Sequence, residues 1–155
     1  MVLTRIDMVD AEREIELNVV VASPTDVVWR ALTDNTAVRD WWAPGVVIDP
    51  EVGGAFVEPW VDPSGRRLVT SGVILELIPG VRLALTWADH GWPYTTYVEI
   101  TLAPHRDGTF VQLRHTGWEQ WATDERVTLL RSHTEGWEHH LTALAVYCEQ
   151  QQEPF

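Results

Sequence analysis

The sequence predicts an α+β fold in which a curved antiparallel sheet wraps around one long C-terminal helix. Three observations predict it. Alternating apolar and polar residues form a β-type segment near the start of the chain. Further β-type segments follow, and the short turns between them are typical of consecutive antiparallel strands. The only long helical pattern comes last, over residues 123–150.

The first strand and two short helices precede the other strands. Every second residue is apolar in the segment 14–22, which is typical of a strand with one buried face; these residues are Ile15, Leu17, Val19 and Val21. Ser23 is a suitable N-cap and Pro24 suits a first helical turn, so a helix is expected over 23–34. The run "NTAVRDWW" predicts a second short helix over 35–42.

The rest of the chain alternates strands with turns and ends in the long helix. Strands are expected over 53–60, 67–78, 81–88, 94–103 and 109–116. Pro79-Gly80 and Asp107-Gly108 are strong turn sequences between them. The helix carries a core-facing stripe of Val127, Leu130, Thr134, Trp137, Leu141, Leu144 and Cys148. One domain is expected over 1–155, with its core at about 14–150 and a frayed tail after it.

Composition narrows the classes of function. The chain has 155 residues, 45% of them hydrophobic, and a net charge of -12 with no lysine. Nucleic acids and anionic membranes need clustered positive charge, so neither is an expected partner. The single cysteine cannot form an internal disulfide, and no apolar run has signal-peptide length. A cytoplasmic location is therefore expected, and the oligomeric state is open.

The segment "HTEGWEHH" invites a metal-site interpretation, which its spacing disfavours. On a helix, His133 and His140 share a face but lie about 10 Å apart along the axis, too far for one ion. We therefore expect no metal and no cofactor. Gly136 costs a helix about 1 kcal/mol relative to alanine, which suggests a close backbone approach or room for Trp137. His133 is either an interfacial histidine with one nitrogen in water or a group of a functional site.

Carboxylates offer no acid–base pair on the predicted inner face. Four of them fall on the polar phase of their strands, namely Glu14, Glu16, Glu76 and Glu99. His115 does follow the apolar phase of its strand and should point towards the long helix. It is either a hydrogen-bonded core histidine or a polar anchor for a ligand, and a general base is a weaker third interpretation. No catalytic residue is assigned.

Nine tryptophans exceed what a core of this size needs, and this excess is the best indication of a ligand cavity. Trp87 continues an inward strand face, and Trp118 and Trp121 precede the long helix, where they could form a lid. Which of Trp41 and Trp42 faces the cavity is left open. The expected cavity residues are Trp42, Phe56, Trp87, His115, Trp118, His133, Trp137 and Leu141.

Six motifs in order resemble a known family. They are "ASPTDVVWRALTD" at 22–34, "WWAPG" at 41–45, "VGGAF" at 52–56, "GVILELIPGVRLALTW" at 72–87, "GTFVQLRHTGW" at 108–118 and "GWEHHLTAL" at 136–144. The chain resembles the START-like (SRPBCC) superfamily, in its branch of heat-shock protein 90 ATPase activator homologues. The resemblance implies a helix-grip fold. It does not select a function, because this superfamily includes lipid binders, cyclases, toxin-binding proteins and co-chaperone domains.

Three functions therefore stand as expectations. The first is binding of a small hydrophobic or aromatic molecule in an apolar, tryptophan-rich cavity between sheet and helix. The second is a co-chaperone-like role with a protein partner, which the named branch implies. The third is an enzyme of cyclase or hydrolase type that acts on a polyketide-like substrate.

Overall fold

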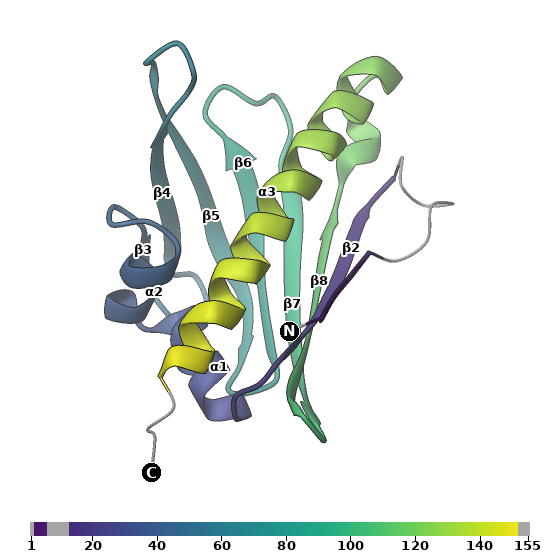
Figure 1. Ribbon diagram of the computed structural model, residues 1–155. Coiled ribbons are helices and arrows are strands. Elements are labelled where there is room, and N and C mark those ends of the chain that lie inside the picture. Colours follow the sequence, from purple (N-terminus) through teal and green to yellow (C-terminus); the bar gives the residue numbers. More distant parts are fainter. Residues whose placement is uncertain (1, 6–12, 152–155) are drawn as a thin grey trace.

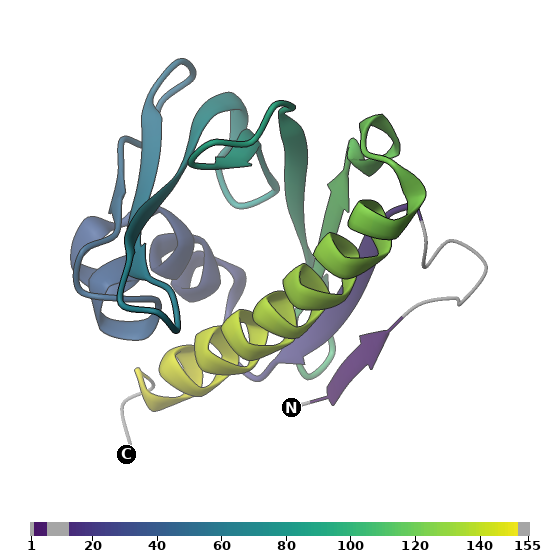
Figure 2. The same cartoon turned by 90° about the horizontal axis from the view of Figure 1, so that it is seen from above.

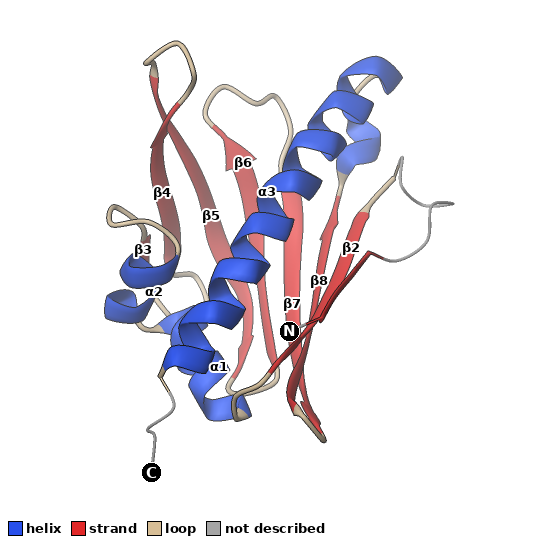
Figure 3. Cartoon of the chain, viewed as in Figure 1, coloured by secondary structure: helices blue, strands red, loops and turns tan. Residues whose placement is uncertain are grey.

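Eight strands and three α-helices make up the computed structural model, which describes residues 2–5 and 13–151 (Figure 1, Figure 3). The strands are β1 (Val2–Arg5), β2 (Ile15–Val21), β3 (Val47–Ile48), β4 (Ala55–Val61), β5 (Arg67–Ile78), β6 (Arg82–Asp89), β7 (Thr96–His105) and β8 (Gly108–Thr116). The helices are α1 (Thr25–Thr33), α2 (Asn35–Trp41) and α3 (Thr123–Gln150), with a short 3-10 helix at Trp118–Gln120. Most of the expected C-terminal tail lies outside the described residues.

The strands form one antiparallel sheet in the order β1-β2-β8-β7-β6-β5-β4-β3. The sheet curves around α3, and α1 and α2 lie near the C-terminal end of that helix (Figure 1, Figure 2). A register shift in β5, between Ile74 and Glu76, accompanies its pairing with β6. Such bulges bend a strand and help a sheet to curve. The predicted α+β helix-grip fold is confirmed.

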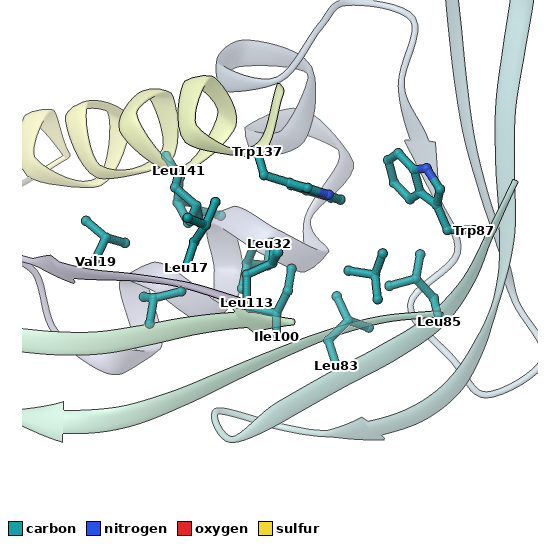
Figure 4. Close-up of a cluster of buried hydrophobic side chains, with 14 of the residues drawn as sticks. Leu17, Val19, Leu32, Leu83, Leu85, Trp87, Ile100, Leu113, Trp137 and Leu141 are labelled. Carbon is teal, nitrogen blue, oxygen red and sulfur yellow. The ribbon is translucent and has the colours of Figure 1, made fainter. Parts of the chain in front are cut away.

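The core lies between the concave face and α3. Leu17 and Val19 of β2 pair with Leu113 and Val111 of β8, and all four are at most 1% exposed. Burying each such side chain contributes about 1.5–3 kcal/mol before the entropy of ordering is subtracted. Figure 4 shows Leu141 facing this layer from the helix. The predicted helical stripe is confirmed in its buried residues Leu130, Trp137, Leu141, Leu144 and Cys148, while Val127 and Thr134 are half-buried.

The convex face carries the carboxylates that the sequence places on the polar side. The Arg82 guanidinium donates to Glu76 and Glu99, each at 2.8 Å, so it joins three neighbouring strands. Arg114 binds Glu14 at 2.8 Å in the same way across β8 and the start of β2. These pairs are partly exposed, so each contributes little to stability.

Two local expectations need correction, and two short strands were not expected. The N-cap of α1 is Pro24 rather than Ser23, and no side chain caps this helix. Val81, the first residue of the strand expected over 81–88, lies in the turn before β6 and is 49% exposed. The short strands β1 and β3 were not expected. A strand of two to four residues contains too few residues for alternation to show in the sequence.

Candidate functional site

A pocket of about 310 Å³ lies between α3 and the strands β4, β5 and β6. Both aromatic and polar side chains line it. Its lining residues are Glu58, Trp60, Thr70, Trp87, Asp89, Ser132, His133, Gly136, Trp137 and His140. The pocket therefore combines the apolar walls typical of small-molecule sites with a small set of polar groups.

A row of polar residues crosses the sheet wall of the pocket. In the strand register Glu58 lies opposite Thr70, and Thr70 lies opposite Asp89. The Trp60 indole N–H donates to the Thr70 hydroxyl at 2.9 Å, and that hydroxyl donates to Asp89 at 2.6 Å. Thr70 is therefore satisfied as acceptor and donor, and it fixes one oxygen of Asp89.

Glu58 is held from behind by α2. The indole N–H of Trp42, the C-cap of that helix, donates to Glu58 Oε2 at 3.0 Å. Burial raises the pKa of Glu58, against the lowering effect of this hydrogen bond, and the nearby Asp89 raises it further. The second oxygen of Glu58 has no hydrogen-bond partner in the described part of the chain. It is free to meet a ligand.

The helix wall presents two histidines, and burial lowers the pKa of both. His133 donates from Nδ1 to the Leu129 carbonyl at 3.0 Å, and its Nε2 lies 3.8 Å from Asp89 Oδ2. Burial lowers its pKa, while Asp89 opposes the change. Burial also lowers the pKa of His140 to about 4, and His139 adds to this. His140 Nδ1 is buried and has no partner within the described residues.

Gly136 opens the pocket on the helix side. A Cβ added at this glycine would meet no atom within 4 Å. The expectation of a close backbone approach is therefore wrong. The missing side chain instead leaves space, and that space belongs to the pocket that Gly136 lines.

A closed hydrogen-bond chain lies behind the pocket, centred on His115. Trp137 Nε1 donates to His115 Nδ1 at 3.0 Å, so the ring proton is on Nε2. Nε2 therefore donates to the Thr96 hydroxyl at 2.7 Å, and this hydroxyl donates to the Trp87 carbonyl at 2.7 Å. Burial holds the pKa of His115 well below 6.5, and the neighbouring His133 lowers it further. With both nitrogens occupied, this neutral, fully buried histidine is a structural element.

The structure distributes the eight expected cavity residues over three places. Trp87, His133 and Trp137 line the pocket. The Trp42 and Phe56 rings pack against Trp87, with centroids 6.3 Å and 5.5 Å away, and so support the wall from behind. The remaining three, His115, Trp118 and Leu141, are core residues that are at most 3% exposed.

The other tryptophans of these segments have structural positions. Trp41 donates its N–H to the Ala31 carbonyl at 2.7 Å, so Trp42 is the one of this pair that reaches the pocket wall. Trp118 is fully buried and Trp121 is 5% exposed, and both pack against Trp92. They are core residues rather than an exposed lid.

The sequence interpretation missed Glu58 and Asp89. The signal was present as period-two alternation, because Glu58 follows Phe56 on the inner face of β4 and Asp89 follows Trp87 on that of β6. The expectation that no carboxylate pair reaches the inner face is therefore wrong. These two acidic groups and His133 can accept, donate or exchange protons with a bound molecule. No group of three or more His, Cys, Asp or Glu residues within the described ranges is arranged to hold a metal ion.

A family model and several solved structures match this chain. The model of the family "Activator of Hsp90 ATPase homolog 1-like protein" matches residues 22–149. The chain belongs to this family. All residues of the pocket lie inside the matched span. No curated protein matches the chain.

Solved structures share the fold of this family member. CalU16 from Micromonospora echinospora is 28% identical, with a TM-score of 0.70, over 96% of this chain and 87% of that one. A protein of Nitrosomonas europaea is 25% identical, with a TM-score of 0.72, over 96% and 100%. DynU16, from the dynemicin biosynthetic locus, is 20% identical, with a TM-score of 0.72, over 88% and 47%, and shows the fold alone. Within the described part of this chain, no helix combines the length and apolarity needed to cross a bilayer.

Proposed function

We propose that this family member binds a small aromatic or hydrophobic molecule in the pocket between α3 and β4–β6. The observation that carries the proposal is a pocket of about 310 Å³ with Trp60, Trp87 and Trp137 in its walls. Flat apolar rings in a concave site bury ligand surface at little cost in side-chain entropy. A cytoplasmic location remains part of the proposal and is supported by the composition.

The test combines ligand binding with a variant that fills the pocket. A ligand that binds only the folded state, present at a hundredfold excess over Kd, adds about 2.7 kcal/mol of stability. For a domain of this size that raises Tm by roughly 5–10 °C. A ligand between the tryptophans should also quench their fluorescence. A screen of small aromatic compounds should therefore give hits with both signals.

Gly136 offers matched variants for this screen. Gly136→Leu should abolish both signals, because its side chain enters the pocket without a clash at Cβ. Gly136→Ala adds only a methyl group and should retain them. If hits bind Gly136→Leu unchanged, the ligand lies elsewhere. A broad screen without hits would contradict the proposal and favour the protein-interaction alternative.

An acid–base enzyme is the second candidate, and one observation favours it. Glu58, Asp89 and His133 surround a single pocket, and the environment raises the pKa of Glu58 and lowers that of His133. Titratable groups whose pKa values are perturbed by burial in one pocket are typical of acid–base sites. The test is deuterium exchange at the α-carbon of small aryl ketones in D₂O. Exchange that depends on the protein and is lost in Glu58→Gln would support the enzyme; no exchange would reject it for this substrate class.

A further inference from the structure

The pocket is acidic, and within the described ranges the one basic group beside its carboxyl groups is His133, whose Nε2 lies 3.8 Å from Asp89. Glu58 and Asp89 form part of one wall, and the lining contains no lysine or arginine among the described residues. The two lining histidines do not replace them, because burial lowers the pKa of both. The whole chain carries a net charge of -12 and so adds no attraction for an anion. A carboxylate or phosphate ligand would therefore meet two like charges in a desolvated site.

Trp87 supplies a second and independent observation. Its side chain is 5% exposed, and its indole Nε1 is buried without a hydrogen-bond partner among the described residues. The neighbouring indoles are all satisfied: Trp42 donates to Glu58, Trp60 to Thr70 and Trp137 to His115. Figure 4 shows the Trp87 nitrogen on the ring edge turned away from Trp137. Buried N–H groups are rarely left unpaired, so this donor calls for an acceptor, and Trp87 belongs to the pocket lining.

We propose that the pocket takes an organic cation: an aromatic amine-bearing molecule whose ammonium group lies by Glu58 and Asp89 and whose oxygen accepts the Trp87 N–H. This inference rests on the proposed function and adds the chemical class of the ligand. The ammonium group donates to the free oxygen of Glu58 and to Asp89, which lies across Thr70 from it. Charge-assisted hydrogen bonds of this type are stronger than neutral ones.

The aromatic walls suit the same ligand. Tryptophan attracts cations as well as aromatic rings, and Trp60, Trp87 and Trp137 all belong to the lining. An alkyl ammonium ligand is thereby held by carboxylates and indoles together. A neutral hydrocarbon would bury the same surface but leave Glu58, Asp89 and the Trp87 N–H without partners.

Four probes with one phenyl ring test the inference by calorimetry. Three of them carry a hydroxyl group and differ in charge: 2-amino-1-phenylethanol is cationic, 1-phenylethane-1,2-diol is neutral and mandelate is anionic. The fourth, phenethylamine, is cationic and lacks the hydroxyl group. The amino alcohol should bind at least about tenfold more tightly than mandelate, with the diol between them. Equal affinities, or tighter binding of mandelate, would overturn the cation inference and leave the proposed function standing. If none of the four binds, the cation inference fails, and the screen of aromatic compounds decides the proposed function separately.

A matched pair of variants locates the charge effect. Glu58→Gln keeps an oxygen for the Trp42 N–H and removes the charge, so it should weaken the two amines severalfold and leave the diol unchanged. Glu51→Gln makes the same change in net charge at an exposed turn position and should leave every affinity unchanged. An equal loss of amine affinity in both variants would show a general charge effect and refute the site.

The Trp87 N–H provides a direct readout in the unmodified protein. Its ¹H–¹⁵N resonance, assigned by through-bond NMR, should move downfield when the amino alcohol or the diol binds. Phenethylamine brings no oxygen and should not cause this movement. A Trp87 resonance that responds identically to phenethylamine and to the amino alcohol would exclude the proposed oxygen contact.

Discussion

Trp137→Phe isolates the hydrogen bond that joins α3 to the sheet. The substitution keeps a ring on the buried face of the helix but removes the donor that His115 Nδ1 accepts at 3.0 Å. An unsatisfied buried acceptor costs about 1–3 kcal/mol. The smaller ring adds a cavity cost of about 1–2 kcal/mol. We expect a total loss of roughly 2–5 kcal/mol, which lowers Tm by roughly 5–15 °C for a domain of this size.

Urea denaturation followed by circular dichroism measures this loss, with an unchanged m-value as the check that the unfolding transition is the same. Trp29→Phe is the matched control, because Trp29 packs at the core edge and its indole makes no hydrogen bond within the described residues. A Trp137→Phe variant that loses no more stability than Trp29→Phe would refute the proposed His115 tautomer and its chain. The same chain predicts that the wild-type His115 ring carries its proton on Nε2, which ¹⁵N NMR shows directly.

Gly136, His140 and Cys148 each give one further prediction. Gly136→Ala should stabilise the protein by about 1 kcal/mol in urea, because helix propensity rises and the new methyl group meets nothing. The folded-state pKa of His140, about 4, lies below its ordinary 6.5, so stability is lost as pH falls from 6.5 to 4. This loss is roughly 3 kcal/mol at about 1.4 kcal/mol per pH unit, and urea titrations of His140→Gln should lack it. Burial raises the pKa of Cys148 to about 12, so a thiol reagent at pH 8 should react only after unfolding.

Periodicity was sufficient to predict the elements that face the core. Leu17, Trp87 and Trp137 each continue an apolar phase, and all are buried as that phase requires. Long elements repeat their pattern several times, so a single departure does not hide it. Two short elements, β1 and β3, have no such redundancy, and they form because β2 and β4 offer them strand edges.

The candidate site depended on information that no local pattern carries. The apolar phase of its strand predicts that His115 points inward. Its hydrogen-bond partners, Thr96 and Trp137, belong to β7 and α3, so only the folded structure shows which role it has. Glu58 and Asp89 are 31 positions apart and meet through Thr70 only because β4, β5 and β6 pair in this register. Alternation places each of them on the inner face of its own strand, but only the strand pairing brings the two together.

Glu58 links the stability of the fold to its proposed function. Burial raises the pKa of this carboxyl group above its ordinary value, so the folded state binds a proton that the unfolded chain releases more readily. Stability is therefore lost as pH rises from the ordinary glutamate pKa through the raised one, and at neutral pH the ionised group opposes folding. Glu58→Gln keeps the Trp42 hydrogen bond and should be more stable than wild type at pH 7.

The advantage of Glu58→Gln should shrink as pH falls to 4, because Glu58 then becomes mostly protonated in the folded and the unfolded protein. Urea titrations at the two pH values, with Glu51→Gln as the exposed control, measure it. A variant that is no more stable at pH 7 would show that Glu58 is well solvated and not the desolvated acid described above. A variant that gains stability while it loses amine affinity would show that position 58 trades stability for binding, as functional sites do.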